Sequence, residues 1–299
     1  MRILITGAHG QLGTALVSGL EDCGQIYACS RDQIDITSAT DVADFIASYN
    51  PNIIINTAAY TNVDGAETNS ELAYEVNTTA VKNLVEAAKK SAAFLIHFST
   101  DYVFDGTRRN SYDEAAAMNP INIYGKTKAA ADAHIIANLD DYAIFRVAWL
   151  YGIQGNNFPK KILAAAAEKP ALNIVDDQLG TPTSVGFISA AIKAYLGLVT
   201  HPAKPASGVY NLVPNGCASW YDFAMFLLEN AVEKGANLQC LPAAINPIKS
   251  SQINQAAPRP PAVILNNKAI QQRLGVKFAD WRDEAAKFVD DYQRNQNAL

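Results

Sequence analysis

A glycine-rich turn near the N-terminus constrains the fold of this chain more than any other stretch. An apolar run over residues 2–6 predicts a strand, and apolar residues at helical spacing predict a helix over residues 12–20. Glycines between a strand and a helix allow a tight turn and let backbone N–H groups at the helix N-terminus approach a pyrophosphate. An ordinary strand–turn–helix connection is the alternative. We expect a dinucleotide to bind here, against Gly7, Gly10, Gln11, Leu12 and Gly13.

The end of the next strand bears on which dinucleotide would bind. This strand, about 26–30, is followed by Arg31, whereas an acidic residue often stands near this position to hold the 2′-hydroxyl of the adenosine ribose. An arginine can instead bind a 2′-phosphate through paired hydrogen bonds. Ser30 and Arg31 therefore predict a preference for NADPH, with use of NADH left open. Asp35 and Ile36 are expected to flank the adenine, and a solvated surface arginine is the alternative for Arg31.

The same pattern of strand and helix continues through the first half of the chain. Thr37 or Ser38 can cap a helix that runs to about residue 48. The wholly apolar run Ile53-Ile54-Ile55 is typical of a central parallel strand. Further elements are expected as a helix over 70–90 and as strands ending near 98 and spanning 142–148. The sequence therefore predicts an α/β fold with a doubly wound parallel Rossmann sheet.

The alternation becomes less regular in the second half, which suggests a second, smaller unit. We expect residues 1–150, together with about 172–212, to form an NADP-binding Rossmann domain. Residues of about 151–171 and 213–299 would then form a smaller α/β substrate-binding domain. Within it, a stretch rich in Pro, Ala, Ser and Asn, residues 242–262, is expected to form a long loop over the site.

Composition excludes several classes of partner. The chain has 299 residues and a formal net charge of −5, which argues against nucleic acid or an anionic membrane surface as the main partner. No apolar run approaches the roughly 20 residues that a membrane helix needs. The four cysteines show no C-x-x-C spacing, as expected of reduced thiols in the cytoplasm, and the four histidines are scattered without a metal-ligand pattern.

A tyrosine and a lysine four residues apart carry the chemical hypothesis. Tyr124 and Lys128 would share one face of a helix, downstream of a strand that breaks at Ser99-Thr100. An ammonium beside a phenol lowers the pKa of the phenol, which can then protonate a carbonyl oxygen as that carbonyl is reduced. Thr100 could present its hydroxyl to the same oxygen. The alternative is an exposed helical pair with no chemical role.

Taken together, these motifs resemble the extended short-chain dehydrogenase/reductases, and within them the dTDP-4-dehydrorhamnose reductase family. The resemblance runs nearly from end to end. Its most specific blocks are Ser99-Thr100-Asp101-Tyr102-Val103-Phe104 and Gly155-Asn156-Asn157-Phe158, supported by Asn56 to Thr61, Arg146 to Trp149, Asp177-Gln178 with Pro182-Thr183, and Arg259-Pro260. The glycine turn and the Tyr124/Lys128 pair belong to the whole superfamily.

The resemblance implies roles for individual residues. Tyr124 would be the proton donor, Lys128 would bind the nicotinamide ribose, and Thr100 stands where the superfamily has a serine or threonine. Residues implied to line the cofactor are Ala58, Ala59, Tyr60, Thr61 and Phe98. Residues implied to contact the nucleotide-sugar, besides Thr100 and Tyr124, are Asp101, Trp149, Asn157 and Arg259. A structural loop arginine between two prolines is the alternative for Arg259.

The function implied is NADPH-dependent reduction of the 4-keto group of dTDP-6-deoxy-L-lyxo-4-hexulose to give dTDP-L-rhamnose. Two alternatives stay open: another nucleotide-sugar ketoreductase or epimerase, and a non-catalytic regulatory subunit like that of methionine adenosyltransferase. The resemblance also leaves a homodimer open. Some members of this family form metal-bridged dimers through acidic side chains, but Ser184-Val185-Gly186 here contains no acid, so we predict no metal.

Overall fold

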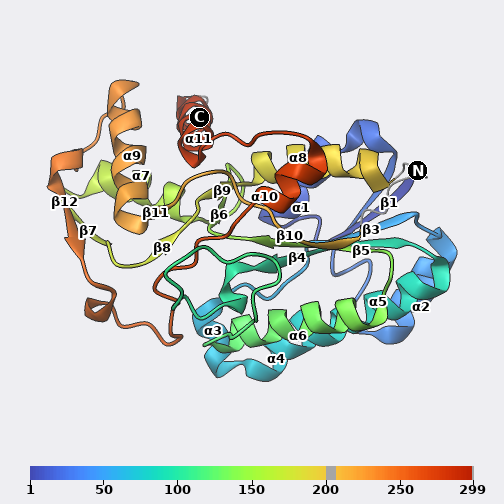
Figure 1. The fold of residues 1–299 in the computed structure, drawn as a ribbon. Coiled ribbons are helices and arrows are strands. Elements are labelled where there is room, and N and C mark those ends of the chain that lie inside the picture. The colour runs from blue at the N-terminus through green and yellow to red at the C-terminus, as the bar shows by residue number, and fades with distance from the viewer. Residues whose placement is uncertain (200–206, 298–299) are drawn as a thin grey trace.

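The computed structural model describes residues 1–199 and 207–297 and contains a six-stranded sheet with helices on both faces (Figure 1). Each pair of neighbouring strands in this sheet is parallel. The strands, in their order across the sheet, are β10 (Gly208–Asn211), β5 (Tyr142–Val147), β4 (Phe94–Thr100), β3 (Ile53–Asn56), β1 (Arg2–Thr6) and β2 (Gln25–Cys29). The predicted doubly wound α/β sheet is therefore confirmed.

Strand β1 marks the point where the strand order reverses. It pairs with β2 on one side and with β3 on the other, so the connections that leave these strands turn in opposite directions. A crevice opens outside the carboxyl ends of strands at such a point, and ligands of doubly wound sheets bind there. The glycine turn follows β1 directly, as the sequence predicts.

Side chains alternate between the two faces of the sheet because successive residues of a strand point to opposite sides. Ile3, Ile55 and Phe145 belong to a core shared with α1 (Gln11–Gly19), α8 (Val185–Val199) and α10 (Lys268–Leu274). Their neighbours Leu4, Ile54 and Ile144 belong to a second core on the opposite face, shared with α2 (Ala39–Tyr49), α5 (Ala80–Ser91) and α6 (Ile123–Asn138). Figure 1 shows these two helical layers on either side of the strands.

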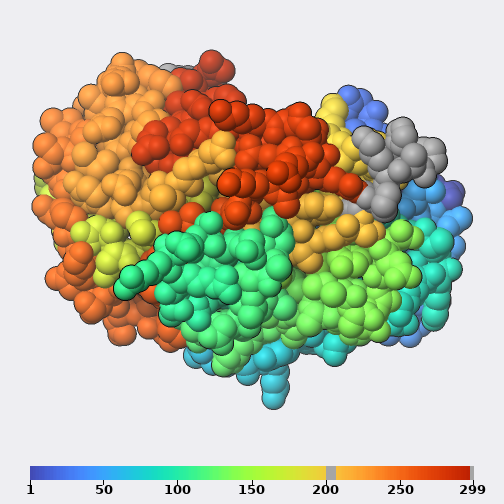
Figure 2. All heavy atoms as spheres, viewed as in Figure 1, coloured from blue at the N-terminus to red at the C-terminus, as the bar shows by residue number. Residues whose placement is uncertain are grey.

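A separate apolar cluster lies at one end of the molecule. It joins α7 (Phe158–Glu168), α9 (Trp220–Glu233) and α11 (Trp281–Asn297) around the fully buried ring of Trp281. Three two-stranded sheets border it: β6 (Leu150–Tyr151) with β9 (Thr183–Ser184), β7 (Leu172–Val175) with β12 (Ile245–Ile248), and β8 (Leu179–Gly180) with β11 (Ala218–Ser219). In the space-filling view, orange and red residues of the C-terminal part form this end (Figure 2).

The expected division into two domains stays a proposal, and the packing adds detail to it. Of the segment 172–212, α8 and β10 pack with the six-stranded sheet, whereas Leu172 and Ile174 of β7 belong to the separate cluster. Residues 200–206 of that segment lie outside the described residues. The stretch 242–262 is not a plain loop, because it contributes β12 and two short 3₁₀ helices, Pro242–Ala244 and Ser250–Gln252.

The expected continuous helix over 70–90 is interrupted. It consists of α4 (Ser70–Tyr74), a π-helical turn (Glu75–Thr79) and α5, and a short helix α3 (Val63–Thr68) precedes it. The π turn directs the buried Asn77 side chain inward, where it bonds both backbone groups of Tyr60, at 2.8 and 3.0 Å, and the hydroxyl of Thr127 at 2.9 Å. These three bonds account for a break that apolar periodicity does not reveal.

Two helical glycines should respond differently to substitution. A Cβ at Gly13 would lie 2.3 Å from the carbonyl oxygen of Gly7, so Gly13→Ala must displace backbone and should lower the free energy of unfolding by roughly 1–3 kcal/mol or more. At Gly186 a Cβ would meet only the Ser184 hydroxyl, at 3.7 Å, so Gly186→Ala is the matched control and should be neutral or stabilising. Thermal or urea unfolding measures both, and equal effects would contradict the packing argument.

Candidate active site

Two clefts lie along the carboxyl edge of the six-stranded sheet and join at the glycine turn. The first has a volume of about 360 Å³ and the second about 460 Å³. Gly10, Thr57, Ala58 and Ala59 line both, so they form one continuous groove. Of the predicted site residues, the first cleft is lined by Gly7, Gly10, Ser30, Arg31, Asp35, Ile36, Ala58, Ala59 and Tyr60. The second is lined by Gly10, Gln11, Leu12, Ala58, Ala59, Thr61, Phe98, Thr100, Asp101, Tyr124, Lys128 and Trp149.

The groove exists because two backbone segments approach each other closely. Gly7 has a φ of +67°, and a Cβ there would lie 2.6 Å from the backbone nitrogen of Ala58. The hydroxyl of Thr57 donates to the carbonyl oxygens of Thr6 and Gly7, at 2.7 and 3.1 Å, and fixes this approach. Gly13 lines neither cleft, because its α-hydrogen faces the glycine turn itself.

Helix α6 presents Tyr124 and Lys128 to the second cleft. Its N-terminus is capped by Asn122, whose side chain accepts from the backbone N–H of Gly125 at 2.8 Å. The backbone N–H of Ile123 donates to Glu67 at 2.8 Å. These bonds place Tyr124 in the first turn of the helix and Lys128 one turn later.

Thr100 and Tyr124 both line the second cleft, and the hydroxyl of Thr100 is held by its neighbours in sequence. This hydroxyl donates to the carboxylate of Asp101 at 3.0 Å and accepts from the backbone N–H of Tyr102 at 3.2 Å. The proton of Thr100 therefore points to Asp101 here, and its predicted bond to a ketone oxygen would require that proton to turn.

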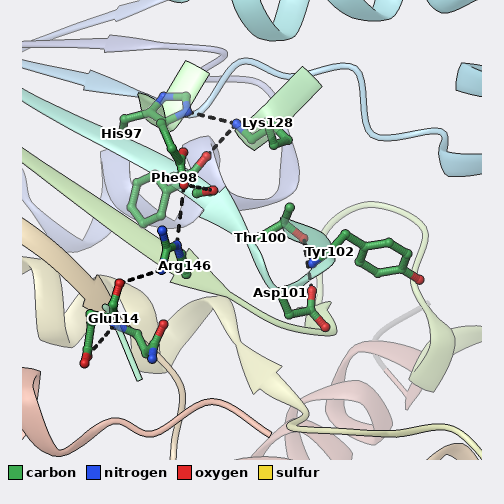
Figure 3. Close-up of polar contacts among 11 residues, drawn as sticks. His97, Phe98, Thr100, Asp101, Tyr102, Glu114, Lys128 and Arg146 are labelled. Carbon is green, nitrogen blue, oxygen red and sulfur yellow. Dashed lines mark hydrogen bonds and ion pairs between the residues drawn. The ribbon is translucent and has the colours of Figure 1, made fainter. Parts of the chain in front are cut away.

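The expectation that Lys128 lowers the pKa of Tyr124 is wrong for this structure. Burial raises the pKa of Tyr124, and the nearby hydroxyl of Thr100 offsets only part of that rise. The amine of Lys128 is engaged elsewhere: it donates to the carbonyl oxygen of Phe98 at 2.7 Å and lies 3.0 Å from Nε2 of His97 (Figure 3). The phenol thus remains protonated at neutral pH.

Asp101 is an unusual carboxyl group beside this pair. It is 5% exposed, and burial raises its pKa to about 7, although the hydroxyl of Thr100 opposes the rise. A carboxyl with such a pKa exchanges its proton near neutral pH, as acid–base groups in active sites do. The sequence identified this position only through the family resemblance, because nothing in the local pattern reveals its burial.

A small third cavity extends the groove toward the separate cluster. It is lined by predicted residues Asp101, Trp149 and Arg259 and by others that sequence reasoning missed, namely Tyr102, Gln178, Leu179, Trp220, Pro260 and Val263. Trp149 stacks on Trp220 with ring centroids 3.5 Å apart and an interplanar angle of 6°. Gly180 packs against the indole of Trp149, since a Cβ at Gly180 would lie 2.4 Å from that ring. No motif spacing relates Trp220 to Trp149, so the sequence gives no signal for the stack.

Arg259 and Asn157 have structural partners. Arg259 forms a bidentate ion pair with Asp64, in which Nη1 donates to Oδ1 at 2.5 Å and Nη2 donates to Oδ2 at 2.7 Å. This ion pair lowers the pKa of Asp64 to about 2. Asn157 caps α7 and donates to the side chain of Gln11 at 2.8 Å and to the carbonyl of Gly152 at 2.7 Å. Asn157 lines none of the three cavities, whereas its neighbour Asn156 lines the second. Substrate contacts by Arg259 and Asn157 stay predictions.

Two further findings concern the described residues. Within 1–199 and 207–297, no group of three or more His, Cys, Asp or Glu side chains could hold a metal ion, and His201 lies outside this part of the chain. The helices in the same part are too short or too polar for any of them to cross a membrane. The predicted absence of a metal stays a prediction.

Comparison with known proteins places the chain among relatives of similar length. A family model described as RmlD substrate binding domain matches residues 1–294. The dTDP-4-dehydrorhamnose reductase of Aggregatibacter actinomycetemcomitans is 37% identical over 94% of this chain and 96% of its own. That of Escherichia coli K12 is 35% identical over 97% of this chain and 98% of its own.

A solved structure agrees with these sequence relatives. The dTDP-4-dehydrorhamnose reductase of Bacillus anthracis, crystallised in complex with NADP, has a TM-score of 0.89 and 32% identity, covering 97% of this chain and 99% of its own. Model, sequences and structure match nearly the whole chain, including the glycine turn and α6. The protein therefore belongs to the dTDP-4-dehydrorhamnose reductase family.

Proposed function

We propose that this protein reduces the 4-keto group of dTDP-6-deoxy-L-lyxo-4-hexulose with NADPH and so forms dTDP-L-rhamnose. The observation that carries the proposal is the single groove that joins the glycine turn to Thr100, Tyr124 and Lys128. Relatives of nearly the same length bear the name of this reductase, and one of them was crystallised with NADP.

The residues of the groove fit a dinucleotide. The close approach of Gly7 to Ala58 leaves backbone but no side chain where a pyrophosphate would lie against the start of α1. Arg31 lines the first cleft and can bind a 2′-phosphate, while Asp35 and Ile36 line the same cleft, where an adenine would lie. When bound, NADPH supplies the hydride for reduction of a carbonyl.

The chain itself supplies the proton and holds the sugar. Tyr124 is protonated at neutral pH because burial raises its pKa, so it can donate a proton to the oxygen of the ketone. Donation leaves a phenolate, and a cationic Lys128 that has turned from His97 toward the phenol would stabilise that charge. Asp101, Trp149 and Trp220 border the side of the groove where the nucleotide-sugar would bind.

A cytoplasmic location and a homodimeric assembly complete the proposal. The four cysteines are all free thiols, and a reducing compartment keeps thiols in that state. The family resemblance is the support for a homodimer, and size-exclusion chromatography with light scattering would measure the assembly.

Substitution of the proton donor tests the chemistry. Tyr124→Phe removes the only proton that the ring can give, so turnover of the keto sugar should fall by roughly 10²- to 10⁴-fold while the affinity for NADPH changes little. Tyr142→Phe, at a half-buried tyrosine outside the groove, is the matched control and should keep full turnover. An unchanged turnover number for Tyr124→Phe would remove this residue from the mechanism. Binding of NADPH without turnover by the unmodified protein would favour a regulatory role.

Cofactor preference tests the role of Arg31. Arg31→Ala should lower kcat/KM for NADPH by roughly 10- to 100-fold, because a charge-assisted bond to the 2′-phosphate is lost, and should leave NADH unaffected. Arg109→Ala, at an exposed loop position, controls for the loss of a positive charge. Equal use of NADPH and NADH by the unmodified enzyme would contradict the predicted preference.

The buried carboxyl of Asp101 should make stability depend on pH. Its pKa is about 7 in the folded protein and 3.8 in the unfolded chain, so the folded state binds a proton more tightly. Above pH 4 the unfolded chain therefore gains relative stability until about pH 7. Asp101→Asn removes this penalty, and its gain over the unmodified protein should reach on the order of 4 kcal/mol at pH 8 and nearly vanish at pH 4. Thermal unfolding at both pH values measures the difference, and a pH-independent effect would contradict the assignment.

A further inference from the structure

We propose that His97 is a positioning residue for Lys128: its protonated Nε2 donates to the neutral form of the lysine amine and so holds that form against strand β4. The proposal deepens the role of the site and rests on the reductase function proposed above. It follows from a buried line of hydrogen bonds that runs from β1 through β3 and β4 to α6. Asn56 and His97 are each 1% exposed and Lys128 is 2% exposed.

The orientation of Asn56 is the first step. The backbone N–H of Ala58 donates to Oδ1 of Asn56 at 3.1 Å, and the hydroxyl of Thr6 donates to the same oxygen at 2.7 Å. A backbone N–H can only donate, so the amide group of Asn56 cannot be turned the other way round. Its Nδ2 must therefore be the atom that faces Nδ1 of His97, at 3.1 Å.

The tautomer of His97 follows from that contact. Nδ2 of Asn56 donates, so Nδ1 of His97 accepts and carries no proton. Burial holds the pKa of His97 well below its usual value, and the neighbouring Lys128 lowers it further, so the ring is neutral. A neutral imidazole with a bare Nδ1 carries its proton on Nε2.

The state of Lys128 follows in turn. Nε2 of His97 lies 3.0 Å from Nζ of Lys128, and a protonated Nε2 needs an acceptor at that distance (Figure 3). Only the neutral amine has a lone pair to offer, since an ammonium group has three donors and no acceptor. The amine still donates to the carbonyl oxygen of Phe98 at 2.7 Å. An ammonium would instead set two N–H groups against each other and would have to leave His97.

The charged groups around the amine set the pH at which its neutral form appears. Burial lowers the pKa of Lys128 to about 8, and only the carboxylate of Asp132, on the same helix, opposes that fall. The ammonium is therefore the major form at pH 7, and the neutral amine becomes the major form above about pH 8. Asp132 is itself paired with Arg146 of β5 at 3.5 Å and accepts from Ser99 of β4 at 2.8 Å, so much of its charge is already compensated. Asp101, from the 3₁₀ helix after β4, acts on Tyr124 rather than on Lys128.

The consequence for catalysis is a link between the charge of Lys128 and its position. The neutral amine rests on His97, and the ammonium leaves it, free to stabilise the phenolate of Tyr124. The N–H donor on His97 stabilises the neutral form of Lys128, which cannot stabilise the phenolate. His97 therefore helps to set the pH above which the reaction slows. Loss of that donor should keep Lys128 charged to higher pH.

Two variants of His97 separate this role from packing. In His97→Asn the side-chain oxygen can still accept from Asn56, but the shorter side chain has no donor that reaches Lys128. The pH at which kcat/KM falls on the alkaline side of its pH profile, the alkaline limb, should therefore rise by roughly half to one pH unit. In His97→Gln the longer amide can place its NH₂ near the former Nε2, so the alkaline limb should stay where it is. The proposal would be overturned if the alkaline limb of kcat/KM stays in place in a folded His97→Asn protein. It would also be overturned if the limb moves equally in both variants.

A measurement on the unmodified protein needs neither turnover nor a variant that is fully active. Long-range ¹H–¹⁵N correlation of the histidine rings at pH 7 should show Nε2 protonated and Nδ1 bare for His97, with the resonance assigned by its loss in either variant. Protonation on Nδ1, or on both nitrogens, would overturn the proposal. If the tautomer is as expected but no keto sugar is reduced, the proposed function fails and the arrangement of His97 and Lys128 stands.

Discussion

The close contact between the ends of strands β1 and β3 is the constraint on which the rest of the site depends. Gly7 can adopt its positive φ and lie against the backbone of Ala58 only because it has no side chain. The contact brings the glycine turn and the segment after β3 to one edge, and the groove follows that edge to α6. A side chain at Gly7 would push apart the two walls between which a cofactor would bind.

Burial, rather than any one ion pair, tunes the chemical groups of the site. It raises the pKa of Tyr124 and that of Asp101, and it lowers the pKa of Lys128 and that of His97. All four shifts favour the neutral form, as expected when solvent is excluded from ionisable groups. The groove thus assembles side chains that can each gain or lose a proton with small changes in their surroundings.

The sequence was informative where a pattern has one physical cause. The apolar run Ile53-Ile54-Ile55 is typical of a strand covered on both faces, and residues four apart, such as Tyr124 and Lys128, share one face of a helix. Features made by residues far apart in the chain left no local pattern. The stack of Trp149 on Trp220 is one, and the bond between Lys128 and His97, which redirected the expected effect on Tyr124, is another.

The π turn before α5 also restricts the number of residues that can lie between α4 and α5. A π turn holds one residue more than an α-helical turn, and here the surplus lets Asn77 reach Tyr60 and Thr127. Removing one residue would rotate all of α5 by about 100° relative to α4 and turn its buried Leu84 and Val85 away from the sheet. The hydrogen bonds by which Asn77 joins Tyr60, in the first cleft, to Thr127 of α6 thus depend on the number of residues before α5 as well as on their identity.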